Sequence, residues 1–210
     1  MTDELLPRRE RERLQHKQEI LDTALRLFSE QGFHNISMQQ IAEASEFSVG
    51  TLYNFFNSKE ALFKELINSC GEKIIETLVA IMDAPGTEVE RLRNFIRYAG
   101  TLLEEHAQFI KLYVSELGTR GAKLSKRRER QDFDAVLNDR LERTLDDGIR
   151  KGLFRRVDPA ITAKAINSII ETLGFEMAGQ FDKVVATEMF AKVEKLFIDG
   201  LLLPREGDDD

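Results

Sequence analysis

The amino-acid sequence predicts an all-α protein of 210 residues. Apolar residues recur every three or four positions along most of the chain, which is the spacing of one buried helix face. Serine, threonine or aspartate stands just before several of these periodic stretches, where helix N-caps are expected. We find no convincing strand pattern, so helices are expected throughout.

Composition is typical of a globular protein. Hydrophobic residues make up 42% of the chain and charged residues 32%, and no apolar run approaches the roughly 18 residues that a membrane-spanning helix needs. The N-terminus carries charges where a signal peptide needs its apolar segment, and the single cysteine, Cys70, cannot close an intramolecular disulfide. These features predict a cytoplasmic protein. We expect no cofactor, no metal and no membrane partner.

Four helices are predicted in the first part of the chain, over about 12–31, 38–45, 49–55 and 59–83. Gly32 ends the first helix where a left-handed residue is favoured. Ser37, with Gln40 three residues later, forms a capping-box pattern, and Ser48 and Ser58 are expected N-caps of the next two helices. Two short helices that are joined by a tight turn and braced by a longer one form a helix-turn-helix.

The third predicted helix has an apolar face and a face suited to a DNA groove. Leu52, with Phe55 or Phe56, forms the apolar face. The remaining residues are small or hydrogen-bonding and mostly uncharged: Ser48, Val49, Gly50, Thr51, Tyr53 and Asn54. Val49 suits contact with a thymine methyl group, and Gln39 or Asn54 suits a base edge, adenine above all. Alternatively, Thr51 and Tyr53 only pack and cap the helix.

Residues 20–62, ILDTALRLFSEQGF…ISMQQIAEASEFSVGTLYNFFNSKEAL, resemble the DNA-binding region of the TetR (tetracycline repressor) family of bacterial transcriptional regulators. The shared features are the glycine and phenylalanine after the first helix, the Ile-Ala pair in the second, the Gly-Thr-Leu-Tyr run of the third and the Phe-x-Ser-Lys-Glu-x-Leu run after it. The resemblance covers roughly the first third of the chain. It implies a homodimer in which each recognition helix enters a major groove of double-stranded operator DNA.

The resemblance also implies roles for individual residues. Ser37, Thr51 and Tyr53 would contact phosphates. Lys59 would hold the DNA backbone beside the groove, and Gly50 would let the helix approach closely.

Three positions depart from the family pattern. Glu46 stands where the turn often has glycine, so it either adopts a positive φ at a cost of about 1 kcal/mol or reshapes the turn. Val49 replaces a common lysine, and Asn54 replaces a larger or basic residue. The operator sequence therefore does not follow from the resemblance.

The chain has few positively charged residues that could contact DNA phosphates. The formal net charge is −7, and only the stretch 8–17, which ends in Lys17, is clearly positive near the N-terminus. Phosphate neutralisation drives much of nucleic-acid binding, so any contact must rest on a few placed residues. The arginines of this stretch, with Lys17, either follow the DNA backbone or enter a minor groove. Alternatively they pair with their own acids, as Arg8 and Glu12 would at helical spacing.

The chain is expected to divide into a DNA-binding domain over 1–60, a helical effector-binding and dimerisation domain over 61–203, and an acidic, disordered tail over 204–210. Thr87 with Glu90 forms a second capping-box pattern, and Asp158 with Pro159 is a strong helix start.

The last two predicted helices are apolar on broad faces. In the TetR family such a pair packs against its copy as a four-helix bundle. The residues expected at this dimer interface are Ile166, Ile169, Ile170, Leu173, Met177, Met189, Val193, Leu196 and Phe197. Alternatively, these helices only complete the core of the monomer.

The middle helices are expected to enclose an effector pocket. Polar or aromatic groups on otherwise apolar faces give a pocket its specificity. The candidates are Tyr98, His106, Phe109, Tyr113, Phe133, Asn167 and Glu171, whose aromatic bias favours an apolar or aromatic small molecule. The basic run 123–130 is either a solvated helix start or a contact for an anionic ligand or for DNA.

These observations predict a ligand-responsive transcriptional regulator, most simply a repressor that a small-molecule effector releases from its operator. Phosphate-binding loops, nucleophile elbows and zinc-binding motifs are absent from the sequence, so we expect no enzyme and no catalytic residues. The alternative is a helical adaptor that binds another protein through its terminal helices.

Overall fold

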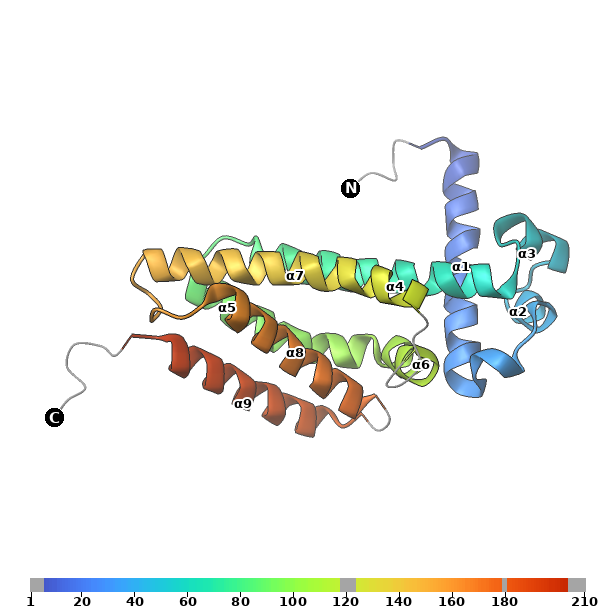
Figure 1. The fold of residues 1–210 in the computed structure, drawn as a ribbon. Helices are drawn as coiled ribbons and strands as arrows, with labels where there is room; N and C mark the ends of the chain where they lie inside the picture. Colours follow the sequence, from blue (N-terminus) through green and yellow to red (C-terminus); the bar gives the residue numbers. More distant parts are fainter. Residues whose placement is uncertain (1–5, 118–123, 179–180, 204–210) are drawn as a thin grey trace.

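The computed structural model describes residues 6–117, 124–178 and 181–203. In these residues it contains nine α-helices, one short 3₁₀ helix and no named β-strand, so the predicted all-α fold is confirmed. The elements are α1 (Arg8–Gln31), η2 (Phe33–Asn35), α2 (Met38–Ala44), α3 (Val49–Phe55), α4 (Lys59–Met82), α5 (Glu88–Glu105), α6 (Ala107–Leu117), α7 (Leu124–Arg150), α8 (Pro159–Met177) and α9 (Lys183–Leu201). Figure 1 shows α1, α2 and α3 at one end of the molecule, and α4 leading away from them into a bundle of the remaining helices.

Some predictions fall outside the described part of the chain. The expected tail over 204–210 lies there, as do the side chains over 117–134, which include Phe133 and the basic run 123–130. Within the described ranges, no helix is both long and apolar enough to span a membrane.

Serine side chains cap the starts of α2, α3 and α4 as predicted. Ser37 Oγ accepts a hydrogen bond from the backbone N–H of Gln40 at 3.3 Å, and the Gln40 side chain accepts one from the backbone N–H of Ser37 at 2.9 Å. Ser48 Oγ accepts from the backbone N–H of Thr51 at 3.0 Å, and Ser58 caps α4 in the same way. These caps satisfy N–H groups that have no partner inside the helix, so local chemistry sets where α2, α3 and α4 begin.

The turn between α2 and α3 contains a left-handed glutamate. Glu46 has φ of 60°, the one non-glycine residue with positive φ in the described ranges. Its backbone N–H donates to the Glu43 carbonyl at 3.2 Å, and the Phe47 N–H donates to the Ala42 carbonyl at 2.9 Å. These two bonds form a Schellman motif, which normally has glycine at the left-handed position. Of the two outcomes predicted for Glu46, the positive φ is confirmed.

Helix α1 begins at Arg8, earlier than the start predicted near residue 12. Its first buried residue is Ile20, so three turns of the helix precede the core. Spaced side-chain pairs support these turns: Arg8 Nε lies 2.7 Å from Glu12 Oε1, and the Gln15 side chain donates to Glu19 at 2.9 Å. Such pairs stabilise an exposed helix, which explains why a polar segment remains helical.

A first apolar cluster holds the N-terminal helices together. Leu52 of α3 and Ile41 of α2 are fully buried in it, and Phe28 of α1 is 1% exposed. Leu62 and Leu66 from the first turns of α4 belong to the same cluster. The buried side chains therefore continue past residue 60, and the domain boundary there stays a prediction.

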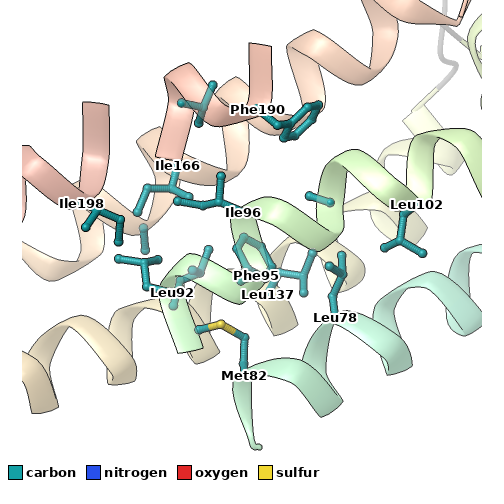
Figure 2. Packing of buried hydrophobic residues seen from close by; sticks show 14 of the residues in the cluster. Leu78, Met82, Leu92, Phe95, Ile96, Leu102, Leu137, Ile166, Phe190 and Ile198 are labelled. Carbon is teal, nitrogen blue, oxygen red and sulfur yellow. The ribbon is translucent and has the colours of Figure 1, made fainter. Parts of the chain in front are cut away.

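A second, larger apolar cluster forms the body of the molecule. Figure 2 shows Phe95 and Ile96 of α5 at its centre, with Met82 of α4 on one side. Phe190 of α9 and Ile166 of α8 pack on the other side. Because α5 contributes buried residues along most of its length, the other helices are arranged around it.

The strain at Glu46 gives a testable expectation for stability. Glu46→Gly removes the Cβ that disfavours positive φ, and a more flexible unfolded chain offsets part of that gain. We expect the free energy of unfolding, measured by urea denaturation, to rise by roughly 0.5 kcal/mol. Glu43→Gly is the matched control, because a glycine inside α2 should lower stability by about 1 kcal/mol. Equal losses in both variants would show that Glu46 is unstrained.

Candidate DNA-binding surface

Two side chains hold α3 on the N-terminal core and leave its other face open. Leu52 is fully buried and Phe56, just after the helix, is 4% exposed. Elsewhere on the helix, Val49 is 37% exposed and Tyr53 is 50% exposed. Asn54 is also exposed. The structure therefore presents an outer face of α3 that the monomer core does not use.

The hydroxyl groups at the start of α3 bond to each other. Ser48 Oγ and Thr51 Oγ1 lie 2.8 Å apart, and Thr51 is half-buried. Thr51 thus takes part in the cap, as one alternative predicted. Tyr53 differs, because half of its surface is open.

A shallow groove of about 500 Å³ connects α2 and α3. It brings together five of the predicted DNA-binding residues: Ser37, Gln39, Val49, Tyr53 and Lys59. Ser48, Gly50, Thr51 and Asn54 lie on α3 or at its start and do not line this groove. His34, Asn35, Ile36 and Met38 also line it, and the sequence did not point to them. His34 and Asn35 belong to a 3₁₀ helix, which carries no motif of its own, and Ile36 and Met38 are mostly buried core residues.

Lys59 of α4 bonds to the segment between α1 and α2 that borders this groove. Its Nζ donates hydrogen bonds to the carbonyls of Phe33 at 2.9 Å and Ile36 at 2.8 Å. The same ammonium lies 4.4 Å from the centroid of the Phe33 ring, a cation–π contact. Lys59 therefore positions η2 and the start of α2.

Lys17 lies away from the groove. Its Nζ pairs with the Glu65 carboxylate, which joins α1 to α4. Both residues line a different surface depression between these two helices. The structure therefore separates Lys17 from the other predicted DNA-binding residues.

One acid in the first turn of α4, Glu60, interacts with the free N–H groups there. The pKa of the Glu60 carboxyl is held below its ordinary value, first by a hydrogen bond from its own backbone N–H and then by the Ser58 side chain. The carboxylate is fully exposed and stays charged at neutral pH, which favours the helix terminus.

A small apolar cavity lies among α5, α6 and α8. Its volume is about 10 Å³, room for about one water molecule. The lining residues are Leu103, Ala107, Ile110, Gly174, Met177, Ala178 and Phe181. None of the predicted effector residues lines this cavity, and the sequence offered no signal for its walls, because an apolar pocket wall and a solid core have the same composition.

The predicted effector residues are spread around the bundle. Phe109 and Tyr113 of α6 come together, with ring centroids 5.8 Å apart, and Tyr113 stacks on Phe175 of α8 at 6.2 Å. His106 caps the end of α5, where burial lowers the pKa of its imidazole and favours the neutral form. The remaining candidates with described side chains, Tyr98, Asn167 and Glu171, lie on α5 and α8.

The residues predicted at the dimer interface, on α8 and α9, differ in how far the monomer already buries them. Ile166 has no exposed surface, and Met177 and Val193 are 7% and 8% exposed within the monomer core. Ile169, Ile170, Leu173, Met189 and Phe197 are partly buried. Leu196 is 63% exposed. A side chain with no free surface has none to offer a partner, so the expectation for Ile166 is corrected.

A short recognition helix anchored on the N-terminal apolar cluster, with its uncharged outer face open, defines a helix-turn-helix DNA-binding transcriptional regulator. Residues 20–66 match the family model for bacterial regulatory proteins of the tetR family, and residues 89–181 match that of a tetracyclin repressor-like C-terminal domain. Together the matches span more than half of the chain. The chain belongs to the TetR family of bacterial regulatory proteins.

Individual relatives agree with this assignment. YuxN of Bacillus subtilis, an uncharacterized HTH-type transcriptional regulator, is 34% identical over 100 residues, which is 46% of this chain and 33% of YuxN. KstR2 of Mycobacterium tuberculosis, an HTH-type transcriptional repressor, is 25% identical over 144 residues, covering 65% of this chain and 68% of KstR2. The structure of the transcriptional regulator FadR from Bacillus subtilis in complex with stearoyl-CoA has a TM-score of 0.71 at 22% identity, covering 87% of this chain and 98% of that chain. FadR therefore shares the fold.

The contacts of Lys59 predict a structural role that can be measured. Lys59→Met keeps the aliphatic stem but leaves two partly buried carbonyls without their donor. We expect the free energy of unfolding to fall by about 1–3 kcal/mol in urea denaturation. Lys111→Met on α6 is the control, because Lys111 is exposed and its loss should change stability by less than about 0.5 kcal/mol. If the two variants unfold alike, Lys59 does not position η2.

Proposed function

We propose that this regulator is a homodimeric repressor whose operator binding is relieved by a small apolar or aromatic effector. The observation that carries the proposal is the open face of α3, where Val49 and Tyr53 keep 37% and 50% of their surface. KstR2, a relative of this chain, is named as a repressor. Operator binding would place the protein with the chromosome, in the bacterial cytoplasm.

The outer face of α3 supports a division of DNA contacts. Tyr53 and Ser37 border the groove between α2 and α3 and carry hydroxyl groups suited to phosphates. Val49, Asn54 and Gln39 are exposed and suited to base edges or a thymine methyl group. In a dimer, two such helices about 34–36 Å apart would enter successive major grooves of a near-palindromic operator.

An effector would enter between α5, α6 and α8. The cavity there is walled by apolar side chains, and the stack of Tyr113 on Phe175 lies between α6 and α8. Its present volume of about 10 Å³ requires α6 and α8 to separate when a ligand binds. FadR, which shares the fold, holds stearoyl-CoA. We infer an effector with a substantial apolar part.

Helix α6 supplies a physical route from that cavity to DNA. Ile110 lines the cavity, whereas Leu112 is fully buried in the N-terminal core. Farther along α6, Glu116 accepts a hydrogen bond from the Phe33 N–H at 3.3 Å. A shift of α6 would therefore move η2 and the start of α2. Reversing a 99:1 population requires an effector that prefers the non-binding state by about 5.5 kcal/mol.

Dimerisation would use the open apolar surface of α8 and α9. Leu196 is 63% exposed, and Ile161 and Val184 are 67% and 68% exposed. A helical pair of this kind buries its apolar face by packing against a second copy in an isologous four-helix arrangement. Ile166 belongs to the monomer core and takes no part in this proposal.

The competing functions have less support. The relatives are transcriptional regulators, a class that is not enzymatic. A protein-binding adaptor would use α8 and α9 but would leave the exposed groove between α2 and α3 unexplained.

Fluorescence anisotropy tests the proposed function. Labelled DNA from upstream of the protein's own gene and a scrambled duplex of equal length are titrated at two salt concentrations. We expect tight binding to the natural sequence that weakens with salt, at two or four chains per duplex. Indifference to sequence across a set of genomic fragments would instead support the adaptor.

Two variants separate phosphate contact from base reading. Tyr53→Ala should weaken binding to all duplexes alike, because a phosphate contact carries no sequence information. Asn54→Ala should change which operator positions matter, with about 1–3 kcal/mol lost at the base it reads. Anisotropy against a panel of single-base operator variants measures both effects. Uniform, sequence-blind losses from both variants would remove Asn54 from the base-reading set.

A further inference from the structure

We infer that the first turns of α1 form a second DNA contact, in which Arg9 and Arg13 bind the phosphate backbone beside the major groove that α3 enters. The inference rests on the proposed function and deepens it. The basic stretch 8–17 was expected either to contact DNA or to pair with its own acids, and the inference assigns Arg9 and Arg13 to DNA contact.

The groove between α2 and α3 lacks a free cation among its lining residues. Helix α3 itself contains no charged residue. Lys59 Nζ is engaged with two backbone carbonyls, and His34 Nε2 lies 3.8 Å from Glu116 Oε2. Because DNA affinity comes largely from cations that neutralise phosphates, a chain of net charge −7 needs such cations close to α3.

Helix α1 brings arginines to the end of α3. The guanidinium of Arg13 lies 5.9 Å from the ring centroid of Phe55, the last residue of α3. About one helical turn farther along α1, the centroid of the His16 ring lies 5.0 Å from that of Phe47, which belongs to the loop between α2 and α3. Figure 1 shows α1 continuing past α3 toward its N-terminus. This face of α1 therefore runs beside the recognition helix.

Arg9 extends the same face by one more turn. It precedes Arg13 by four positions, which places the two side chains on one side of the helix. Arg9 is exposed and forms no ion pair within the described ranges, whereas Arg8 is paired with Glu12. The core begins only at Ile20, so Arg9 has no part in the packing of α1. A free guanidinium one turn beyond Arg13 suits the next phosphate along the flank of the groove.

The test measures the salt dependence of DNA binding with the full chain. A labelled duplex of random sequence is titrated by anisotropy over a series of KCl concentrations with the wild type, Arg9→Gln and the double variant Arg9→Gln/Arg13→Gln. For Arg9→Gln the slope of log Kobs against log[KCl] should fall by about 0.9 per lost phosphate contact, so about 1.8 for a dimer. For the double variant, the slope should fall by up to twice that amount, because two arginines per subunit are removed.

Arg156→Gln is the matched control. Arg156 is also an exposed arginine without an ion pair in the described residues, and it follows α7 at the end of the bundle away from α3. Removing it changes the net charge by the same amount and should leave the slope unchanged. Thermal unfolding verifies that all the variants fold.

The outcomes distinguish the α1 contact from DNA binding as such. A normal slope for Arg9→Gln and the double variant, with wild-type protein that binds DNA, overturns the inference and leaves the proposed function intact. An equal reduction from Arg156→Gln also overturns it, because net charge alone would then explain the effect. Wild-type protein that binds no duplex at low salt overturns the proposed function itself.

Discussion

The anchoring of α3 through Leu52 and Phe56 is the constraint on which the rest of the site depends. A helix of seven residues is too short to persist alone in water, because nucleation outweighs so few hydrogen bonds. Burying these two side chains against α1 and α2 makes the helix stable and also fixes which face points outward. The exposure of Tyr53 and Asn54 is thus a consequence of packing on the other side of the same helix.

The two apolar clusters are joined by helices that belong to both. Helix α4 supplies Leu62 to the N-terminal cluster and Met82 to the body. Helix α6 sends Leu112 into the N-terminal cluster while Ile110 borders the cavity in the body. Because packed interiors resist gradual deformation, α4 and α6 couple the body of the molecule to the N-terminal cluster, and α6 is the one of the two that also borders the cavity.

Features set by neighbouring residues were predictable, whereas contacts between distant segments were not. The capping box at Ser37 follows from a few adjacent residues, and the alternatives at Glu46 follow from the resemblance, because the TetR family often has glycine at that place in the turn; both were anticipated. The partner of Lys17 on α4 and the carbonyls that Lys59 holds depend on how helices cross, which periodicity does not encode. The cavity walls escaped prediction for a related reason, since burial on its own does not distinguish a pocket from solid packing.

The position of α1 has a practical consequence for handling the protein. Its N-terminus projects past α3, while α9 ends at the opposite end of the molecule (Figure 1). The backbone N–H of Arg155 donates to the Leu201 carbonyl at 2.7 Å, which fastens the end of α9 to the segment that follows α7. An affinity tag or fluorescent fusion placed after α9 would therefore stand clear of the operator, whereas one before α1 would crowd it.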